Sequence, residues 1–313
     1  MEIIFENTKE RLDKFLHQKF QALSRNEIQK LIKSDLVLVN QKTALKPSLI
    51  LKTGDKIEIE EKIFKKSKPD DLKPEPKIPL KIVYEDKDLI VINKPAGLIT
   101  HPTDKIRKGT LVNALLARYP KLKSVGENPL RPGIVHRLDK DTSGLIIIPK
   151  NQKSFLFIKQ QFLDHSLEKK YLCLVDGIPL KKSGVIEYPI RPSTKNRLKK
   201  VAVKRLAEIK KSVRAAITKY KVIKTFGQKF ALLEISPQTG RTHQIRVHLS
   251  AINHPVIGDK LYGPKTVSLL NRQFLHAYYL KFISPSNKKI ELEINLPKDL
   301  ENFLKRINKP SKG

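Results

Sequence analysis

The chain has 313 residues and one cysteine, and its 63 lysines and arginines outnumber 31 acidic residues to give a formal net charge of +32. The length allows two domains with separate cores, and the charge predicts a polyanionic partner, for which nucleic acid is the commonest candidate. A single cysteine excludes an internal disulfide and any zinc or iron–sulfur site that needs several cysteines.

The basic residues are unevenly distributed. Residues 191–224 hold 13 lysines and arginines but only one acidic residue, Glu208. Only 14 of the 63 basic residues are arginine, so a genomic bias toward lysine is an alternative explanation for the excess. Because such a bias would not remove acidic residues from one segment, the distribution favours an electrostatic role over a merely solvated lysine surface.

Neither an export signal nor a membrane span is predicted. The start of the chain lacks a basic region followed by a long apolar stretch, and no apolar run approaches the ~18 residues of a membrane span. We therefore expect a soluble, cytoplasmic protein with no membrane partner, and nothing in the sequence demands more than a monomer.

Residues 1–60 are predicted to form a small domain of two helices and short strands. Asn7 and Ser24 each precede a glutamate by three residues, which is the spacing of a helix capping box, and apolar residues follow at helical intervals. Alternating strand patterns occupy residues 36–40 and 56–60.

This order of segments resembles the S4 RNA-binding domain. The matching segments are Arg11 to Leu16, Ser24 to Ile32, Val37 to Asn40 and Gly54 to Ile57. In that module basic residues of the helix pair contact RNA. The resemblance therefore implies RNA contacts, where a plain surface position is the alternative, for Arg11, Arg25, Lys30 and Lys33.

A linker and a second domain are predicted to follow. Residues 61–79 contain four prolines and no glycine, which is typical of an extended, semi-stiff linker. Residues 80–307 contain short β-rich runs and few helices, which predicts an α+β fold on a mostly antiparallel sheet, and residues 308–313 are expected to be a frayed tail. Helices are expected over 111–118, 153–163 and 242–252; strands are expected over 81–84, 89–92, 145–148, 171–175, 218–223, 231–235 and 289–294.

Two polar clusters interrupt this apolar domain. The first runs from His136 to Gly144 and places Asp139 beside Arg137, just before a buried-strand pattern. A carboxylate in such surroundings is either paired or functional. The second cluster runs from Thr239 to His248. Its apolar residues fall on one helical face, and Arg246 falls on another.

Both clusters resemble the signature of RluA-type pseudouridine synthases, in which a His-Arg-Leu-Asp segment precedes a Gly-Arg-Thr-His-Gln-Ile-Arg segment. Three further segments match that family in order and approximate spacing: Tyr84 to Gly97, Tyr171 to Gly177 and Gly258 to Gly263. The resemblance implies a catalytic domain with a large mixed sheet and, because the attached S4 domain is shared by such enzymes, action on large-subunit (23S) ribosomal RNA in the manner of the D type. A stem-loop with accessible bases is the expected target.

The resemblance also implies roles for individual residues. Asp139 is the expected catalytic aspartate, and Arg246 is expected to pair with it, with Arg241 as the alternative partner. Tyr171 is expected to lie against the target base. Arg137 is expected to fill the space left when that base flips out. The expected RNA contacts in this domain are therefore Arg137, His136 and Arg241.

The reaction needs no cofactor, and the sequence contains no dinucleotide-binding, P-loop or zinc-protease motif. A metal site on His136, His243 and His248 is disfavoured, because His243 and His248 are five residues apart and do not share a helix face well, and no carboxylate of the first rank accompanies them. Two other functions remain open. One is a catalytically silent RNA-binding or ribosome-assembly protein of the same fold; the other is a hydrolytic glycosidase or nuclease, which would need a second carboxylate or a metal.

Overall fold

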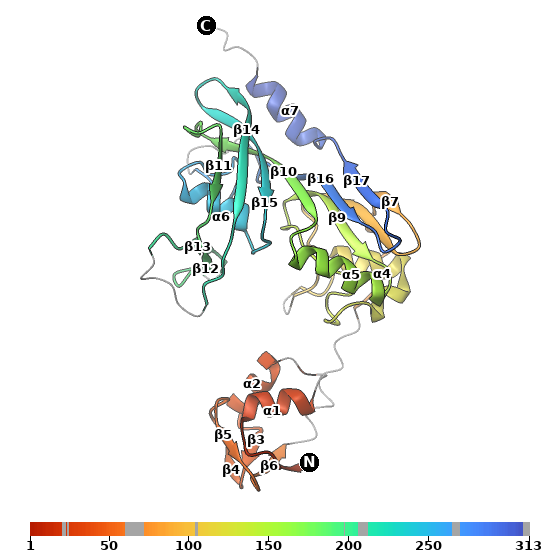
Figure 1. Cartoon of the computed structure of the whole chain (residues 1–313), viewed down its shortest axis with the longest axis vertical. Helices are drawn as coiled ribbons and strands as arrows, with labels where there is room; N and C mark the ends of the chain where they lie inside the picture. The colour runs from red at the N-terminus through yellow and green to blue at the C-terminus, as the bar shows by residue number, and fades with distance from the viewer. Residues whose placement is uncertain are drawn as a thin grey trace. The chain divides into compact units, whose positions relative to one another are not determined.

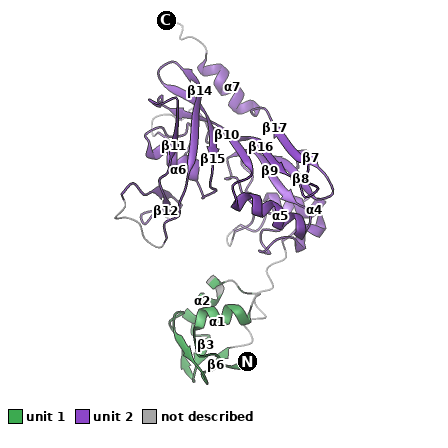
Figure 2. Ribbon diagram, in the orientation of Figure 1, with its two compact units in different colours: residues 1–71 green, residues 72–313 purple. Residues whose placement is uncertain are grey.

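The computed structural model divides the chain into two compact units, residues 1–71 and 72–313 (Figure 2). It describes residues 1–20, 23, 25–59, 72–103, 106–196, 198–205, 212–264 and 270–308. Most of the proposed linker, the capping-box residue Ser24, part of the basic segment 191–224 and all but the first residue of the tail lie outside the described residues.

The first unit packs two helices against small antiparallel sheets (Figure 1). One sheet has the strand order β1-β6-β3-β4, and a second pairs β2 with β5. The core joins Phe5 and Phe15, whose rings meet edge to face, to buried aliphatic residues of both helices. The elements are β1 (Glu2–Ile4), β2 (Lys9–Arg11), α1 (Leu12–Lys19), α2 (Arg25–Lys33), β3 (Val37–Val39), β4 (Lys42–Thr43), β5 (Ile50–Lys52) and β6 (Lys56–Ile59).

The first capping box predicted from the sequence is wrong. Asn7 does not cap a helix, because Lys9–Arg11 pair with β5 and α1 begins only at Leu12. The first free N–H groups of α1 are satisfied by tertiary contacts instead: Leu12 donates to the Leu49 carbonyl and Asp13 to the Pro47 carbonyl. A distant loop thus replaces the side-chain cap that the spacing suggested.

The second unit is built on one large, mostly antiparallel sheet, as expected. Its strand order is β11-β14-β15-β10-β16-β9-β8-β7, with β17 added beside β16, and only β16 and β9 run parallel. Its strands are β7 (Ile82–Glu85), β8 (Leu89–Lys94), β9 (Ser143–Pro149), β10 (Glu168–Asp176), β11 (Ser183–Ile186), β14 (Thr218–Phe226), β15 (Phe230–Pro237), β16 (Leu275–Ile283) and β17 (Lys289–Glu293). A separate small sheet pairs β12 (Ile190–Pro192) with β13 (Lys200–Ala202).

The continuous apolar runs of β8 and β9 are explained by burial on both faces. Ile90 and Ile146 belong to one core cluster, whereas their neighbours Val91 and Ile147 belong to another on the opposite face. A strand covered on both sides loses the alternation of polar and apolar residues. This double burial makes a rigid support for the segment that precedes β9, which carries Asp139.

Helices cover both faces of the sheet. They are α4 (Leu111–Arg118), α5 (Gln152–Leu163), α6 (Gln244–Ala251) and α7 (Lys298–Ile307), with a short 3₁₀ helix at Pro120–Ser124. The three expected helices are therefore confirmed, with α6 shorter than expected. The sequence analysis did not predict α7, although Leu300 and Phe303 have helical spacing; both are buried against Phe274 and other sheet residues.

Gly144 allows the parallel contact that brings the Asp139 segment beside β16 and β10. Its φ is +124°, and a Cβ placed there would lie 2.2 Å from the carbonyl oxygen of Ala277. Only glycine fits such an approach. Because β16 pairs with β10 on its other edge, the segment before β9 meets the part of the sheet that carries Tyr171.

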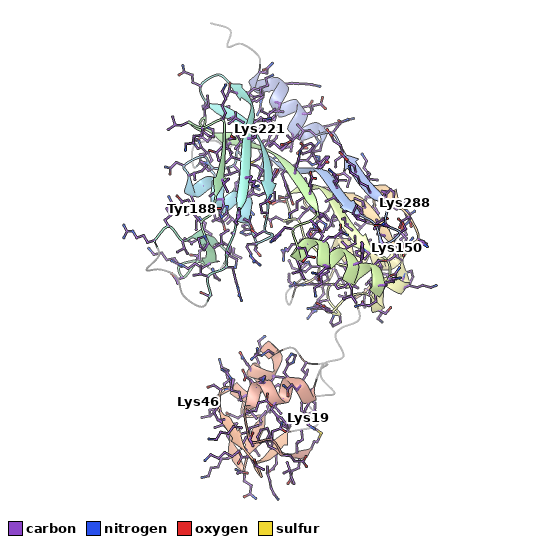
Figure 3. The ribbon with its side chains drawn as sticks, in the orientation of Figure 1. Lys19, Lys46, Lys150, Tyr188, Lys221 and Lys288 are labelled. Atoms are coloured by element: carbon purple, nitrogen blue, oxygen red, sulfur yellow. The ribbon has the colours of Figure 1, made fainter. Side chains whose placement is uncertain are left out.

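Lysine side chains lie on the surfaces of both units, and Figure 3 labels five of them. Lys19 and Lys46 are in the first unit, and Lys150, Lys221 and Lys288 are in the second. In the described part of the chain, no helix is both long enough and apolar enough to cross a membrane.

Candidate active site

A cavity of about 400 Å³ opens in the second unit where the two polar clusters meet. Its walls come from residues 134–139 before β9, residues 237–246 at the start of α6, and β10. Among the described residues, the charged lining is predominantly cationic, because one carboxylate, that of Asp139, lies among five basic side chains: Arg131, Arg137, Lys169, Arg241 and Arg246. Such a lining suits an anionic ligand.

The Asp139 segment is fixed through its backbone carbonyls. Thr100 donates its hydroxyl to the Leu138 carbonyl at 2.7 Å, and the fully buried Lys94 ammonium donates to the Lys140 carbonyl at 3.0 Å. Lys94 also donates to the carbonyls of Pro95 and Leu98, and its burial lowers its pKa to about 7. These bonds hold the residues on both sides of Asp139, so its carboxylate is presented from a rigid turn.

Arg246 joins the two polar clusters. Its Nη1 donates to Asp139 Oδ2 at 2.8 Å, and its Nε and Nη2 donate to the carboxylate of Asp259 at 2.6 and 2.8 Å. The guanidinium is buried, and although burial acts to lower its pKa, the bonds to Asp259 and Asp139 raise it above its ordinary value. Arg246 is therefore a fixed cation that holds Asp139 through one oxygen.

Asp139 keeps its second oxygen available. In the described residues, the short polar contacts of this carboxylate all involve Oδ2, with Arg246 at 2.8 Å and His243 Nε2 at 4.0 Å. The side chain is 16% exposed and lines the cavity. Oδ1 can therefore meet a ligand without breaking the ion pair.

Asp259 has a role at this site that the sequence analysis did not assign. Its fully buried carboxylate accepts from Arg246 and from the backbone N–H groups of Leu261 and Tyr262. Burial acts to raise the pKa of Asp259, but these bonds outweigh it and hold the pKa below its usual value. Gly258, which precedes it, has a φ of +76° and would place a Cβ 2.1 Å from the Arg272 carbonyl oxygen. In the sequence, the segment Gly258 to Gly263 is marked only by its resemblance to the synthase family, which implies no role for Asp259.

His243 lines the cavity beside Asp139, and Tyr262 contacts it from behind. The Tyr262 hydroxyl accepts from the Lys200 backbone N–H at 2.7 Å and lies 3.0 Å from His243 Nδ1. Burial lowers the pKa of His243 despite the opposing effect of Asp139, so the ring is neutral near pH 7. His243 itself has a φ of +59° immediately before α6.

Tyr171 lies on β10 at the cavity wall and is 8% exposed. Its ring packs in the core cluster that contains Leu138, Ile245 and Leu275. Burial, with a further contribution from Asp139, raises the pKa of Tyr171, so its hydroxyl stays protonated throughout the neutral range. One face of this aromatic ring is thus supported by the core while the side chain borders the cavity.

The structure places the three remaining catalytic-domain candidates around the same cavity. Arg137 is exposed, and its Nη1 lies 3.4 Å from Nε2 of the buried His101. His136 is neutral, since burial lowers its pKa to about 3; its Nε2 accepts from the Ile147 N–H, and its ring stacks on Phe162. Arg241 Nε donates to the Ala215 carbonyl, and Arg246 rather than Arg241 forms the ion pair with Asp139.

In the first unit, a buried carboxylate organises two of the four candidate RNA contacts. The Asp13 carboxylate accepts two bonds from Arg11, at 2.9 and 3.0 Å, and one from Gln29 at 2.8 Å, and it lies 3.8 Å from Arg25. The Arg11 and Arg25 side chains remain about half exposed. The last two candidates, Lys30 and Lys33, are exposed in the last turn of α2.

Asp141 and His248 belong to the two polar clusters but do not line the cavity. Asp141 is half-buried, and its backbone carbonyl accepts from Arg272. His248 bonds to Thr218 and to the Tyr188 carbonyl. Within the described ranges, no three His, Cys, Asp or Glu side chains are grouped as metal ligands.

Two family models match the chain. The model of the RNA pseudouridylate synthase family matches residues 88–251, and that of the S4 domain matches residues 10–57. The first range includes Asp139, Tyr171 and Arg246, and the second includes α1 and α2. The chain is thus similar to these families over both compact units.

Similar proteins extend over nearly the whole chain. A protein of Aquifex aeolicus named as an uncharacterized RNA pseudouridine synthase is 41% identical over 91% of this chain and 90% of its own length. The ribosomal large subunit pseudouridine synthase D of Zymomonas mobilis is 36% identical over 95% of this chain and 93% of its own length. The solved structure of human RNA pseudouridylate synthase domain containing 4 matches with a TM-score of 0.57 and 27% identity, over 72% of this chain and 92% of that one.

Proposed function

Because this chain belongs to the RNA pseudouridylate synthase family, and is thus an RNA pseudouridine isomerase, we propose that it modifies uridines of large-subunit (23S) ribosomal RNA with Asp139 as the catalytic group. The observation that carries the assignment of Asp139 is its position: it is the one carboxylate that lines the cavity, held by Arg246 through Oδ2 with Oδ1 free within the described residues.

The reaction breaks the bond between uracil N1 and C1′, turns the uracil and joins its C5 to C1′, with no net redox change. A stacked or paired uridine must first leave its helix to reach the cavity. Asp139 Oδ1 can then attack C1′ or remove a proton from C2′, and a carboxylate also stabilises positive charge on the sugar. Arg246 holds this carboxylate in position for each of these roles.

The neighbouring side chains suit the flipped nucleotide. The ring of Tyr171 is supported by the core and can stack on the uracil, an interaction that contributes about 1–3 kcal/mol per base. The exposed guanidinium of Arg137 is planar and able to occupy the position that the base leaves in the RNA. His136 and Arg241, which also line the cavity, are proposed as further RNA contacts.

Ribosomal RNA is the proposed substrate for two reasons. The Zymomonas mobilis relative, similar over nearly the full length of both chains, carries a name that specifies the large ribosomal subunit. The S4 domain supplies a second RNA-binding unit, in which Arg11, Arg25, Lys30 and Lys33 are the proposed contacts. A stem-loop is the proposed target, because its loop bases are accessible. We propose that the protein acts as a monomer, which sedimentation analysis with and without RNA tests.

The first experiment is to incubate the protein, and an Asp139→Ala variant, with unmodified large-subunit ribosomal RNA and to map pseudouridine by carbodiimide-stop sequencing. We expect stops with the native protein and none with the variant, without added metal. RNA binding without stops on any ribosomal RNA would instead support the alternative, a catalytically silent RNA-binding or ribosome-assembly protein. Stops that persist in the variant would contradict the role of Asp139.

A further inference from the structure

Two adjacent lysines of β10 lie in opposite electrostatic surroundings. Lys170 Nζ lies 3.8 Å from Glu234 Oε2 and 5.0 Å from the ring centroid of Tyr279, so its charge is paired. Lys169 lines the catalytic cavity with Tyr171, and its Nζ lies 5.6 Å from the ring centroid of Phe162. No carboxylate among the described residues forms an ion pair with Lys169.

Burial disfavours the unpaired charge of Lys169. Its side chain is half-buried, and burial alone lowers its pKa to about 8, with no nearby carboxylate to oppose that effect. The neighbouring His136 is neutral and offers no negative charge. A partly buried cation without a counter-charge destabilises the folded protein, and an anionic ligand in the cavity would remove this cost.

We propose that Lys169 binds a phosphodiester group of the RNA strand that carries the target uridine. This inference rests on the proposed function, since it takes RNA as the ligand of the cavity. Lys169 lies two residues before Tyr171 on one strand, roughly 7 Å along it. When the uracil stacks on Tyr171, the sugar–phosphate backbone of the same nucleotide therefore lies within reach of the Lys169 ammonium. This ammonium has three N–H donors and no carboxylate partner in the described structure.

The test compares Lys169→Met with a matched control, Lys170→Met. Methionine keeps an unbranched apolar chain over Phe162 but removes the charge. Filter binding of transcribed, unmodified large-subunit ribosomal RNA is measured over a series of salt concentrations. Removing one phosphate contact is expected to weaken binding about tenfold at low salt and to reduce the slope of log affinity against log salt by about 0.7–0.9. Lys170→Met is expected to keep the native slope and affinity.

Thermal unfolding of both variants separates binding from folding, because loss of an unpaired charge should not lower the stability of Lys169→Met. A native slope and affinity in Lys169→Met would overturn the proposal. So would an equal loss in Lys170→Met, which would indicate a general charge effect, or a loss of maximal single-turnover rate with no change in slope. If the slope falls but the native protein forms no pseudouridine on this RNA, the proposed modification of large-subunit ribosomal RNA fails while the phosphate contact stands.

Discussion

Each unit of the molecule contains a cluster of arginine and carboxylate side chains, and the two clusters differ in which of these side chains is buried. In the first unit, the fully buried member is Asp13, and its arginine partners are about half exposed. In the second unit the arginine, Arg246, is 6% exposed, while one of its two carboxylates, Asp139, reaches the cavity.

The difference shows how one kind of ion pair serves two purposes. The buried member fixes the geometry, because burial makes its hydrogen bonds costly to break. In the proposed function, the more accessible member then meets the RNA. Exposed arginines attract phosphate groups, whereas an exposed carboxylate in a cationic cavity can act on a sugar. The predictions below test this division between a buried anchor and an exposed working group.

Replacing the anchor of the catalytic cluster is expected to have the largest effect. Arg246→Met leaves the buried Asp259 carboxylate without its cation, which should lower the free energy of unfolding by about 3–5 kcal/mol. It should also reduce pseudouridine formation by about 10²-fold or more, because Asp139 is no longer held in position. Denaturant unfolding and single-turnover kinetics measure the two effects. A fully active variant would contradict the anchoring role.

Asp259 and Asp139 both pair with Arg246, but their replacement is expected to have different effects: mainly a loss of stability for Asp259 and a loss of activity for Asp139. Asp259→Asn places an amide against the guanidinium in a buried site and should cost about 1–3 kcal/mol of stability, with activity reduced through Arg246. Asp139→Asn, whose side chain borders the cavity, should lose activity while its stability stays within about 1 kcal/mol of the native protein. Equal destabilisation by both substitutions would show that the cluster has no division of roles.

The Asp13 anchor is expected to make the first unit sensitive to acid. Burial acts to raise the pKa of Asp13, but the bonds from Arg11 and Gln29 outweigh it, so the folded pKa lies below the ordinary value of 3.8. Its stabilisation is therefore complete above pH 3.8 and is lost as the pH falls through the lower, folded pKa.

Hydrogen exchange in α1, followed from pH 5 to pH 2, measures this loss for the full chain. The matched variant Asp13→Asn should be destabilised at neutral pH by about 1–3 kcal/mol and should show a flatter response to acid. A native acid response in that variant would assign the sensitivity to other carboxylates.

The exposed arginines of the first unit are expected to have the smallest effects. Arg25→Ala should reduce the salt slope of RNA binding by about one phosphate contact and leave thermal stability nearly unchanged. Arg11→Ala should reduce the slope equally but should also lower the stability, because it removes two hydrogen bonds from the buried Asp13 carboxylate. Lys46→Ala, on the same unit but outside the helix pair, is the control. If the control lowers the slope equally, binding depends on total charge rather than on the Asp13 cluster.

The sequence by itself determined the family, the two RNA-related domains, the helix over 111–118 and the short list of candidate site residues. These depend on local features: apolar periodicity, and motifs whose residues are neighbours along the chain. The structure corrected the capping of α1 and added α7, because both depend on contacts with distant segments, namely the carbonyls near Leu49 and the sheet residue Phe274.

Only the tertiary structure decided which charges meet. Asp139 and Arg246 are 107 residues apart, and neither the pairing of Arg246 with Asp259 nor the contrast between Lys169 and Lys170 has a local signature. The sequence around a residue indicates its chemical role, but it does not identify the oppositely charged residue that will pair with it. The strength of an ion pair depends on distance and burial, and the order of the strands in the sheet sets both.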